Sequence, residues 1–291
     1  MKYLICVLLF VSQIAGDSNS EAKEKTPEPK AQVVLAQDVK WQPLNPARGK
    51  KGPQAGTLWG DQTGSGASGF LVKFIDGFSS PPHIHNITYR GIVIAGALHN
   101  DDPEATPLWM KAGSYWTQPA GEAHITSARG PSIAYVEIAT GPYLVMPTEK
   151  AFDNGERPVN VDASNVMWLD GSNTSWIRKS PKVAPEKGPK LAFLWGKPQK
   201  GHVNGTMIKL PAGFKGKIAA SGSVSRYVVV QGRLTHHANG GEKAQILEAG
   251  SYFGSPGKSE HRISANEESI LYVSTNGPYE AIAASTGPSG E

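Results

Sequence analysis

The sequence has a single cysteine, Cys6, among 291 residues. It lies in a short apolar run, residues 3–11, which follows Lys2 and precedes the small residues at 14–16. This run is too short to span a bilayer and is typical of a cleaved secretory signal, which we predict over residues 1–16. The mature chain would then contain no cysteine, which excludes disulfides and thiolate chemistry. We expect an exported protein, periplasmic or secreted after cleavage.

Basic clusters and long helical patterns are also scarce. Lys and Arg number 29 against 25 Asp and Glu, a formal net charge of +4, and both signs are mixed along the chain. Because no run of Lys and Arg alternates with aromatic residues, nucleic acid is excluded as the expected partner. No apolar run is long enough for a transmembrane segment. The 33 glycines and 22 prolines instead favour an all-β protein with many turns.

The chain does contain one unit repeated twice. Residues 58–60 (Leu-Trp-Gly) recur as residues 194–196, an offset of 136. Residues 112–115 (Ala-Gly-Ser-Tyr) recur as residues 249–252, an offset of 137. Self-similarity of this kind indicates two copies of one β unit of roughly a hundred residues. Further residues that recur at these offsets are Gly77, Phe78, Gly96, Leu98, Pro119, His124, Gly141, Pro142 and Tyr143.

Composition divides the chain into segments. Residues 17–30 are charged and lack aliphatic side chains, which is typical of a disordered lead-in. We expect an N-terminal unit with a metal site over residues 31–148 and a C-terminal unit over residues 188–291. Residues 149–187, rich in turns, Pro and Lys, would link them. Short strand candidates at roughly 8–12-residue spacing indicate a sandwich or barrel in each unit.

Three histidines suggest a metal site in the first unit. His83 and His85 are two residues apart before a β-branched segment, and side chains at i and i+2 of a strand point to the same face. His124 ends a Pro- and Gly-containing segment that is typical of a turn leading into a strand. Three convergent neutral imidazoles can bind a first-row metal and leave coordination positions free for water or substrate.

The spacing of these residues resembles that of the cupin superfamily. Gly77 and Gly96 bracket His83-x-His85 in a pattern similar to the first cupin motif, and Pro119-x-Gly121-x-x-His124 is similar to the second. Residues 58–61, 83–91 and 114–126 resemble a group of exported bacterial bicupins with a domain of unknown function. The resemblance implies a tandem double-stranded β-helix, a bicupin of two jelly-roll-like barrels.

The resemblance also implies a ligand set, from which this sequence departs at one position. Cupins usually add a glutamate of the first motif to their three histidines, but that position is Tyr89 here. The implied site is a three-histidine set (His83, His85 and His124) for one divalent ion of Fe, Mn, Ni or Zn. Tyr89 is a candidate for a role near the metal, and Glu122 and Glu137 are candidate carboxylates that would replace the usual glutamate.

The second copy lacks this set. Ala219 and Ser221 stand where the first two histidines would be, and only His261 is retained. One imidazole cannot hold a metal with useful affinity, so we expect a degenerate C-terminal unit that serves structure or dimerisation. We interpret His261 as an ordinary hydrogen-bonded histidine, and we expect His236, which precedes a turn, to be solvated.

Residues present in both copies are attributed to the fold. Tyr135 recurs as Tyr272, and Arg90 recurs as Arg226, which favours a structural ion pair over substrate binding. Glu137 occurs in the first copy alone, so the fold does not by itself account for it.

By resemblance, the leading function is that of a metal-dependent, dioxygenase-like enzyme acting on a small oxygen-bearing molecule. Hydrolysis or isomerisation at a Lewis-acid metal is a close second. The alternative from another class is a non-catalytic metal- or ligand-binding or sensing module, and a third is a purely structural role for the histidines. The sequence names neither the metal nor the substrate, and a homodimer remains an open alternative.

Overall fold

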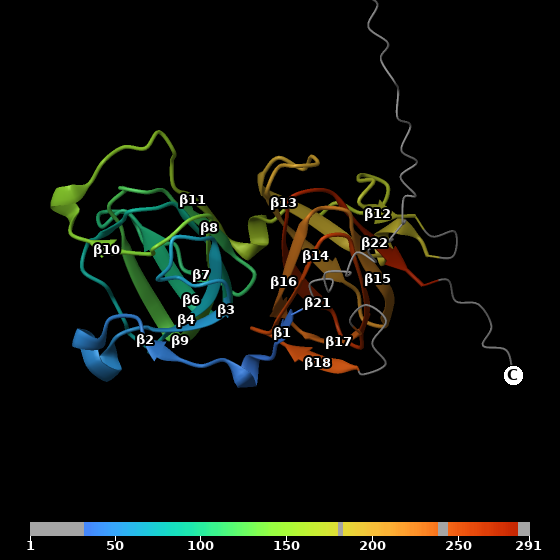
Figure 1. Ribbon diagram of the computed structural model, residues 1–291, viewed down its shortest axis with the longest axis horizontal. Coiled ribbons are helices and arrows are strands. Elements are labelled where there is room, and N and C mark those ends of the chain that lie inside the picture. The colour runs from blue at the N-terminus through green and yellow to red at the C-terminus, as the bar shows by residue number, and fades with distance from the viewer. Residues whose placement is uncertain (1–31, 180–182, 238–243, 285–291) are drawn as a thin grey trace, which may run out of the picture.

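The computed structural model describes residues 32–179, 183–237 and 244–284 (Figure 1). The predicted signal peptide and lead-in lie outside these residues. Strands dominate the described part, which confirms the all-β prediction. No helix within it is long and apolar enough to cross a membrane. Its helices are short 3-10 turns: η1 (Ala36–Asp38), η2 (Pro46–Lys51), η3 (Thr148–Lys150), η4 (Ala163–Asn165) and η5 (Pro185–Lys187).

The N-terminal unit is built from ten of the strands. They are β2 (Gln42–Pro43), β3 (Gln54–Trp59), β4 (Ser68–Phe74), β5 (Ile84–His85), β6 (Tyr89–Asp101), β7 (Met110–Lys111), β8 (Tyr115–Gln118), β9 (Ile125–Ile138), β10 (Val145–Met146) and β11 (Val159–Val161). The larger sheet has the order β11-β8-β6-β9-β4-β3-β2, with β7 beside β6, and β5 pairs with β10 in a second sheet.

The long strands β6 and β9 bend where glycine permits it, so each contributes to both layers of the unit. Gly96, in β6, has φ +73°, and a Cβ there would lie 2.2 Å from the Ser132 hydroxyl oxygen. Only glycine fits this bend without strain. In the second copy, Gly232 (φ +77°) separates two shorter strands at the same place.

The C-terminal unit consists of two six-stranded sheets, with the orders β1-β19-β16-β21-β14-β13 and β12-β22-β15-β20-β17-β18. Their strands pair antiparallel except for β12 and β22, which are parallel. Together the two units confirm the tandem jelly-roll prediction. The strands are β1 (Gln32–Val34), β12 (Ile177–Arg178), β13 (Lys190–Gly196), β14 (Asn204–Leu210), β15 (Phe214–Ala220), β16 (Val224–Gln231), β17 (Arg233–His237), β18 (Gln245–Glu248), β19 (Tyr252–Pro256), β20 (Ser259–Ala265), β21 (Ser269–Thr275) and β22 (Tyr279–Ala283).

Several strands lie elsewhere than the segment boundaries predict. The blue β1, the first described strand, pairs with β19 in a sheet of the C-terminal unit, although the strands that follow it build the N-terminal unit (Figure 1). The predicted linker, residues 149–187, contributes β11 to the first unit and β12 to the second. The two units are therefore tied together by the exchanged strand β1 as well as by a connection.

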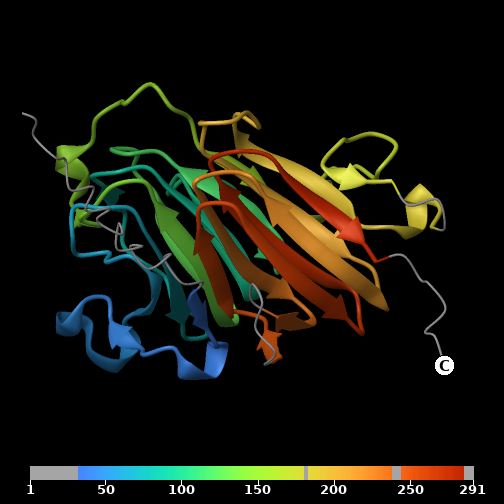
Figure 2. The same ribbon diagram turned by 45° about the vertical axis from the view of Figure 1, so that its right-hand side comes forward.

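The two units pack sheet against sheet. The green strands of the first lie beside the orange and red strands of the second (Figure 2), and a buried apolar cluster contains residues of both. In β4, Phe70 and Val72 belong to the interior of the first unit, while Leu71 belongs to the shared cluster. Both faces of this strand are thus covered, which explains its nearly continuous apolar sequence.

Recurring residues of the two copies meet across this interface. The Arg90 guanidinium lies 4.0 Å from the ring centroid of Trp195, and Arg226 lies 3.7 Å from that of Trp59. The ion pair expected for Arg90 is therefore replaced by a cation–π contact, because the arginine faces an indole of the other unit. The crossed pairs give the interface an approximate twofold symmetry.

The Glu137 side chain lies at the centre of the interface. Its carboxylate accepts hydrogen bonds from the hydroxyls of Tyr135 (3.0 Å), Tyr272 (2.9 Å) and Ser274 (3.3 Å). Burial raises the pKa of Glu137, and the hydrogen bonds from the two tyrosines oppose that rise. Ser274 occupies the equivalent position in the second copy. The carboxylate therefore joins the units.

We expect Glu137→Ala to lower the free energy of unfolding by about 3 kcal/mol, because two buried tyrosine hydroxyls lose their acceptor. Urea denaturation measures this change. Glu137→Gln keeps one acceptor oxygen and should cost less. Metal content should stay unchanged in both variants, so a loss of metal without a loss of stability would contradict the structural role.

Candidate metal centre

Backbone pairing brings the three histidines together. His83 and His124 form an antiparallel bridge, in which the backbone nitrogen of each residue lies 3.0 Å from the carbonyl oxygen of the other. The chain continues from His83 into β5, where His85 pairs with Val145 of β10. Ile84, between the two histidines, is fully buried on the opposite side, as the strand alternation predicts.

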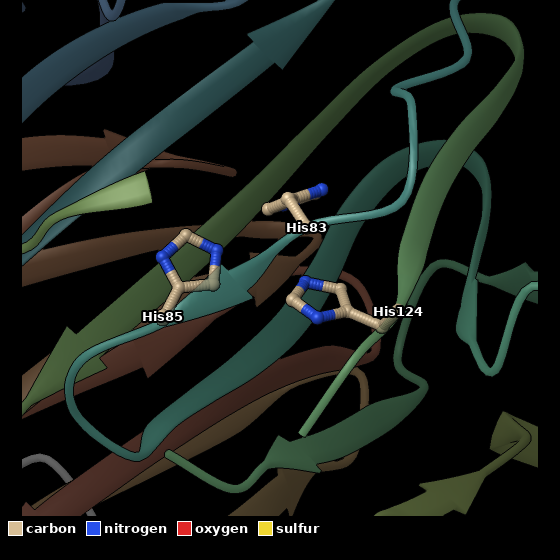
Figure 3. Close-up of side chains that lie close together, drawn as sticks. All are labelled: His83, His85 and His124. Atoms are coloured by element: carbon tan, nitrogen blue, oxygen red, sulfur yellow. The ribbon is translucent and has the colours of Figure 1, made fainter. Parts of the chain in front are cut away.

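The rings face one another, as Figure 3 shows. The ring centroid of His83 lies 4.3 Å from that of His124 and 5.1 Å from that of His85, and the His85 and His124 centroids are 5.2 Å apart. One nitrogen of each ring lies within 4.8 Å of one nitrogen of each of the others. The three predicted metal ligands are thus gathered at one point.

Backbone carbonyls fix which nitrogen of each ring carries the hydrogen. Nδ1 of His83 lies 2.9 Å from the Pro81 oxygen, Nδ1 of His85 lies 2.9 Å from the Leu144 oxygen, and Nδ1 of His124 lies 3.2 Å from the Glu122 oxygen. A carbonyl oxygen only accepts, so each Nδ1–H must donate. Each Nε2 then keeps a lone pair, the arrangement that metal-binding histidines require.

Burial keeps the imidazoles neutral. It lowers the pKa of His124 to about 3, with the nearby His83 acting in the same direction. Burial also lowers the pKa of His85 well below its usual value, with smaller effects of His124 and His83, and it lowers the pKa of the less buried His83. Neutral rings at pH 7 are the form that binds a metal.

Tyr89, at the position of the usual glutamate, lies against the cluster without consuming a lone pair. Its hydroxyl donates to the Asn100 side-chain oxygen (3.0 Å) and lies 3.3 Å from Nε2 of His124. Asn100 donates in turn to Gln118 (2.9 Å). Because the single Tyr89 hydrogen is used by Asn100, Nε2 of His124 remains free.

Tyr143 is a residue of the cluster that the sequence analysis did not identify. Its ring stacks on that of His85, with centroids 4.3 Å apart, and its hydroxyl lies 3.2 Å from Nε2 of His85. Since His85 donates through Nδ1, the Tyr143 hydroxyl is the donor in this contact. It recurs as Tyr279 in the second copy, and that recurrence is why it was attributed to the fold.

The two candidate carboxylates do not join the histidines. Glu137 faces the inter-unit cluster, while its neighbour Val136 faces the cavity on the other side of the sheet. The backbone carbonyl oxygen of Glu122 accepts a hydrogen bond from Nδ1 of His124. The Glu122 side chain interacts electrostatically with Arg157, whose pKa is raised mainly by Asp153 and to a smaller extent by Glu122. Within the described residues the cluster contains imidazoles alone.

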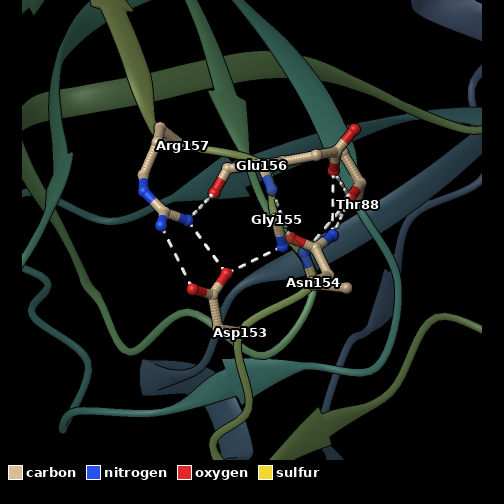
Figure 4. Close-up of polar contacts among 7 residues, drawn as sticks. Thr88, Asp153, Asn154, Gly155, Glu156 and Arg157 are labelled. Carbon is tan, nitrogen blue, oxygen red and sulfur yellow. Dashed lines mark hydrogen bonds and ion pairs between the residues drawn. The ribbon is translucent and has the colours of Figure 1, made fainter.

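A loop outside the site braces the turn between β5 and β6. Asn154 donates to the Thr88 hydroxyl oxygen (3.2 Å), and Thr88 donates to Glu156 (Figure 4). Arg157 and Asp153 close the same loop with a two-bond ion pair. Thr88 also accepts from the backbone of Ala120 (3.1 Å). These contacts connect the two motif segments that carry the histidines.

A cavity of about 350 Å³ adjoins His83 and His85. Its walls are mainly apolar, and they include Val72, Phe74, Phe78, Trp116, Ala134 and Val136. This volume is at the small end of ligand pockets. His83 and His85 line this cavity and His124 lies against both of them. Three clustered imidazoles beside such a cavity fit a divalent first-row metal with coordination positions left for a ligand.

Comparison with known proteins identifies the family. The family model described as "Domain of unknown function (DUF4437)" matches residues 32–282. The chain belongs to the DUF4437 family. A comparison with curated proteins finds no match.

Solved structures share the fold of this DUF4437 chain at low identity. A Nostoc punctiforme protein provisionally described as a dioxygenase is 15% identical, with 92% of this chain and 90% of that chain covered and a TM-score of 0.60. Salicylate 1,2-dioxygenase from Pseudoaminobacter salicylatoxidans, in complex with gentisate, is 13% identical (86% and 84% covered, TM-score 0.55). Oxalate decarboxylase from Bacillus subtilis is 12% identical (88% and 80% covered, TM-score 0.51). These likenesses confirm the bicupin fold.

The interior of the second unit has larger side chains than the first at two equivalent positions. Tyr227 and Leu271 replace Gly91 and Ala134. Tyr227 is fully buried and stacks on Phe253, with ring centroids 4.5 Å apart. Ala134 lines the cavity of the first unit, whereas its counterpart Leu271 is fully buried in the second. Gly91 is covered by the Trp116 ring, which would lie 2.2 Å from a Cβ there.

His236 and His261 form a buried pair in the second unit. Nε2 of His236 lies 2.9 Å from Nδ1 of His261, and both residues are fully buried. The expectation that His236 is solvated is wrong, because β17 turns its side chain into the unit. The expectation of a hydrogen-bonded His261 is confirmed.

This pair predicts a loss of stability in acid. Burial lowers the pKa of His236 to about 4 and that of His261 to about 3, whereas the unfolded chain takes up these protons near pH 6.5. The free energy of unfolding should therefore fall as the pH drops from about 6.5 towards 4.

His236→Asn, which introduces the residue found at the equivalent position of the first unit, removes one of these groups. Between pH 7 and pH 4 the variant should lose about 3 kcal/mol less stability than the wild type, because each pKa unit corresponds to about 1.4 kcal/mol. Comparing urea unfolding of the two proteins cancels the contribution of the buried histidines of the first unit. Equal losses in both proteins would contradict the assignment.

Proposed function

We propose that this chain binds one divalent transition metal through His83, His85 and His124 and acts as an enzyme on a small oxygen-bearing molecule. The observation that carries this proposal is the convergence of three Nε2 lone pairs, each directed by an Nδ1–H···O=C hydrogen bond, beside a ligand-sized cavity. A purely structural histidine cluster needs neither this convergence nor the cavity.

A dioxygenase-like reaction is the class we propose to test first. A bound metal with free coordination positions supplies Lewis acidity and, for iron or manganese, electron transfer. The chain itself supplies an apolar cavity that excludes water and a Tyr143 hydroxyl that can donate to a ligand oxygen. Proteins of the same fold include the salicylate dioxygenase and the Nostoc punctiforme protein described above, which supports the reaction class by analogy of fold.

We further propose that the protein acts after export, as the predicted cleavage after Gly16 implies. A non-catalytic metal- or ligand-binding module remains the alternative. The two functions are separated by whether the metal-loaded protein consumes oxygen with any candidate substrate.

The first experiment is metal analysis by mass spectrometry on protein purified without chelators. The intact mass of the same protein identifies its first residue and so tests the proposed cleavage after Gly16. We expect one metal ion per chain in the wild type. His83→Ala and His124→Ala should each remove most of it, because two imidazoles bind a divalent ion much more weakly than three.

His202→Ala is the matched control, because His202 is exposed in the second unit and should leave the metal content unchanged. No metal in the wild type, even after reconstitution with iron, manganese, nickel and zinc, would overturn the site. Bound metal without oxygen consumption across a substrate screen would favour the binding module.

Tyr143→Phe tests the hydroxyl beside His85. Metal binding would occupy Nε2 of His85 and release the Tyr143 hydrogen for a ligand. We expect unchanged metal content and about a tenfold loss of ligand affinity or kcat/KM, the usual effect of one lost hydrogen bond. An unchanged ligand affinity, measured by calorimetry, would place the hydroxyl outside the reaction. Tyr279→Phe in the second unit is the control and should affect stability only.

A further inference from the structure

A strap of the first unit, the connection between β2 and β3, forms part of the wall of the cavity. Between β2 and β3 the chain leaves the sheet at Leu44 and returns at Pro53, where the Leu44 N–H donates to the Pro53 oxygen (2.9 Å). The helix η2 lies within this excursion and begins at Asn45, whose side chain accepts from the Ala47 N–H. Leu44, Asn45, Pro46, Arg48 and Pro53 all line the cavity.

Among the described residues that line the cavity, Arg48 of this strap is the only permanently charged one. The other polar lining residues are neutral side chains (Asn45, Ser80, His83, His85, Tyr89, Asn100, Thr126 and Tyr143). None of the ion pairs found among the described residues involves Arg48. Arg48 lines the same cavity as His83 and His85 of the histidine cluster.

Comparison with the second copy shows which residues of the strap recur and which occur in the first unit alone. Lys51, Gly52 and Pro53 recur as residues 187–189, so the offset of 136 holds up to the strap. Arg48 does not recur, because Ala184 stands at its equivalent position. The unit that lacks the two histidines of the first motif thus also lacks the arginine.

With a metal bound, the candidate site would have a net positive charge. A divalent ion on three neutral imidazoles keeps its full +2 charge, and Arg48 adds a further positive charge in the cavity lining. Among the described residues, no carboxylate lines this cavity. The remaining walls are apolar and suit a hydrocarbon or aromatic body.

We propose that the site takes small monocarboxylates with an apolar body, the carboxylate lying between the metal and the Arg48 guanidinium. This inference rests on the proposed metal site and names its substrate class. Charge-assisted hydrogen bonds of a guanidinium to a carboxylate supply orientation as well as affinity. The apolar walls then hold the rest of the molecule.

The test uses zinc-loaded protein, which is redox-inactive, and calorimetric binding of mandelate and mandelamide. The two probes share their shape and chelating hydroxyl and differ in the charge of one group. We expect the wild type to bind mandelate at least about tenfold more tightly than the amide. Acetate, which has no apolar body, should bind more weakly than mandelate because it leaves the cavity walls uncovered.

Arg48→Gln should lower the affinity for mandelate about tenfold and leave that for mandelamide unchanged. Lys51→Gln is the matched control: it removes the same charge from the same helix, at a residue that recurs in the second copy and does not line the cavity. It should change neither affinity.

Zinc content is measured for every protein before titration. A wild type that does not load zinc would overturn the metal site and this inference with it. A zinc-loaded wild type that binds acid and amide equally, or an Arg48→Gln variant that behaves as Lys51→Gln does, would overturn the carboxylate inference alone.

Discussion

The face-to-face packing of the two central sheets is the constraint on which the rest of the molecule depends. Residues of both units form a shared buried cluster, so the central strands are covered on both faces and need apolar or hydrogen-bonded residues at every position. The crossed arginine–tryptophan contacts, Arg90 on Trp195 and Arg226 on Trp59, place charged groups in this layer without ion pairs. One face of the N-terminal sheet is thereby committed to the other unit, and only the opposite face is available for a ligand.

The approximate symmetry of the interface explains why Glu137 occurs once. It lies near the symmetry axis, where equivalent residues meet, and its partner there is Ser274. A glutamate in both copies would place two buried carboxylates against each other, which is strongly unfavourable unless one is protonated. A residue found in one copy alone is therefore not necessarily catalytic. Ala134 shows the opposite case, because it lines the cavity in one copy while its counterpart Leu271 is fully buried in the other.

The sequence predicts the fold and the histidine cluster because both depend on local spacing. His83 and His85 share a face by strand alternation, the repeat indicates two copies of one β unit, and the resemblance to the cupin motifs implies that each is a jelly roll. Tyr143 was missed because it comes from a different strand connection and recurs in the second copy. Glu137 was misplaced because alternation gives two faces of a strand without saying which one is the interior. The pairing of β1 with β19 involves residues more than two hundred positions apart, and no local pattern reports such a contact.

The position of the one central carboxylate decides the charge of the candidate site. Glu137 and Val136 are neighbours on β9, and the sheet separates the glutamate from the cavity. At the motif position where cupins usually provide an acidic ligand, Tyr89 donates its hydrogen to Asn100 and offers no negative charge. Within the part of the chain that the structure describes, no carboxylate would balance a divalent ion on the three imidazoles, while Arg48 adds to the positive charge. Neutrality must then come from outside the protein, as hydroxide or as an anionic ligand, and an apolar cavity favours the anion that also has a body to bury.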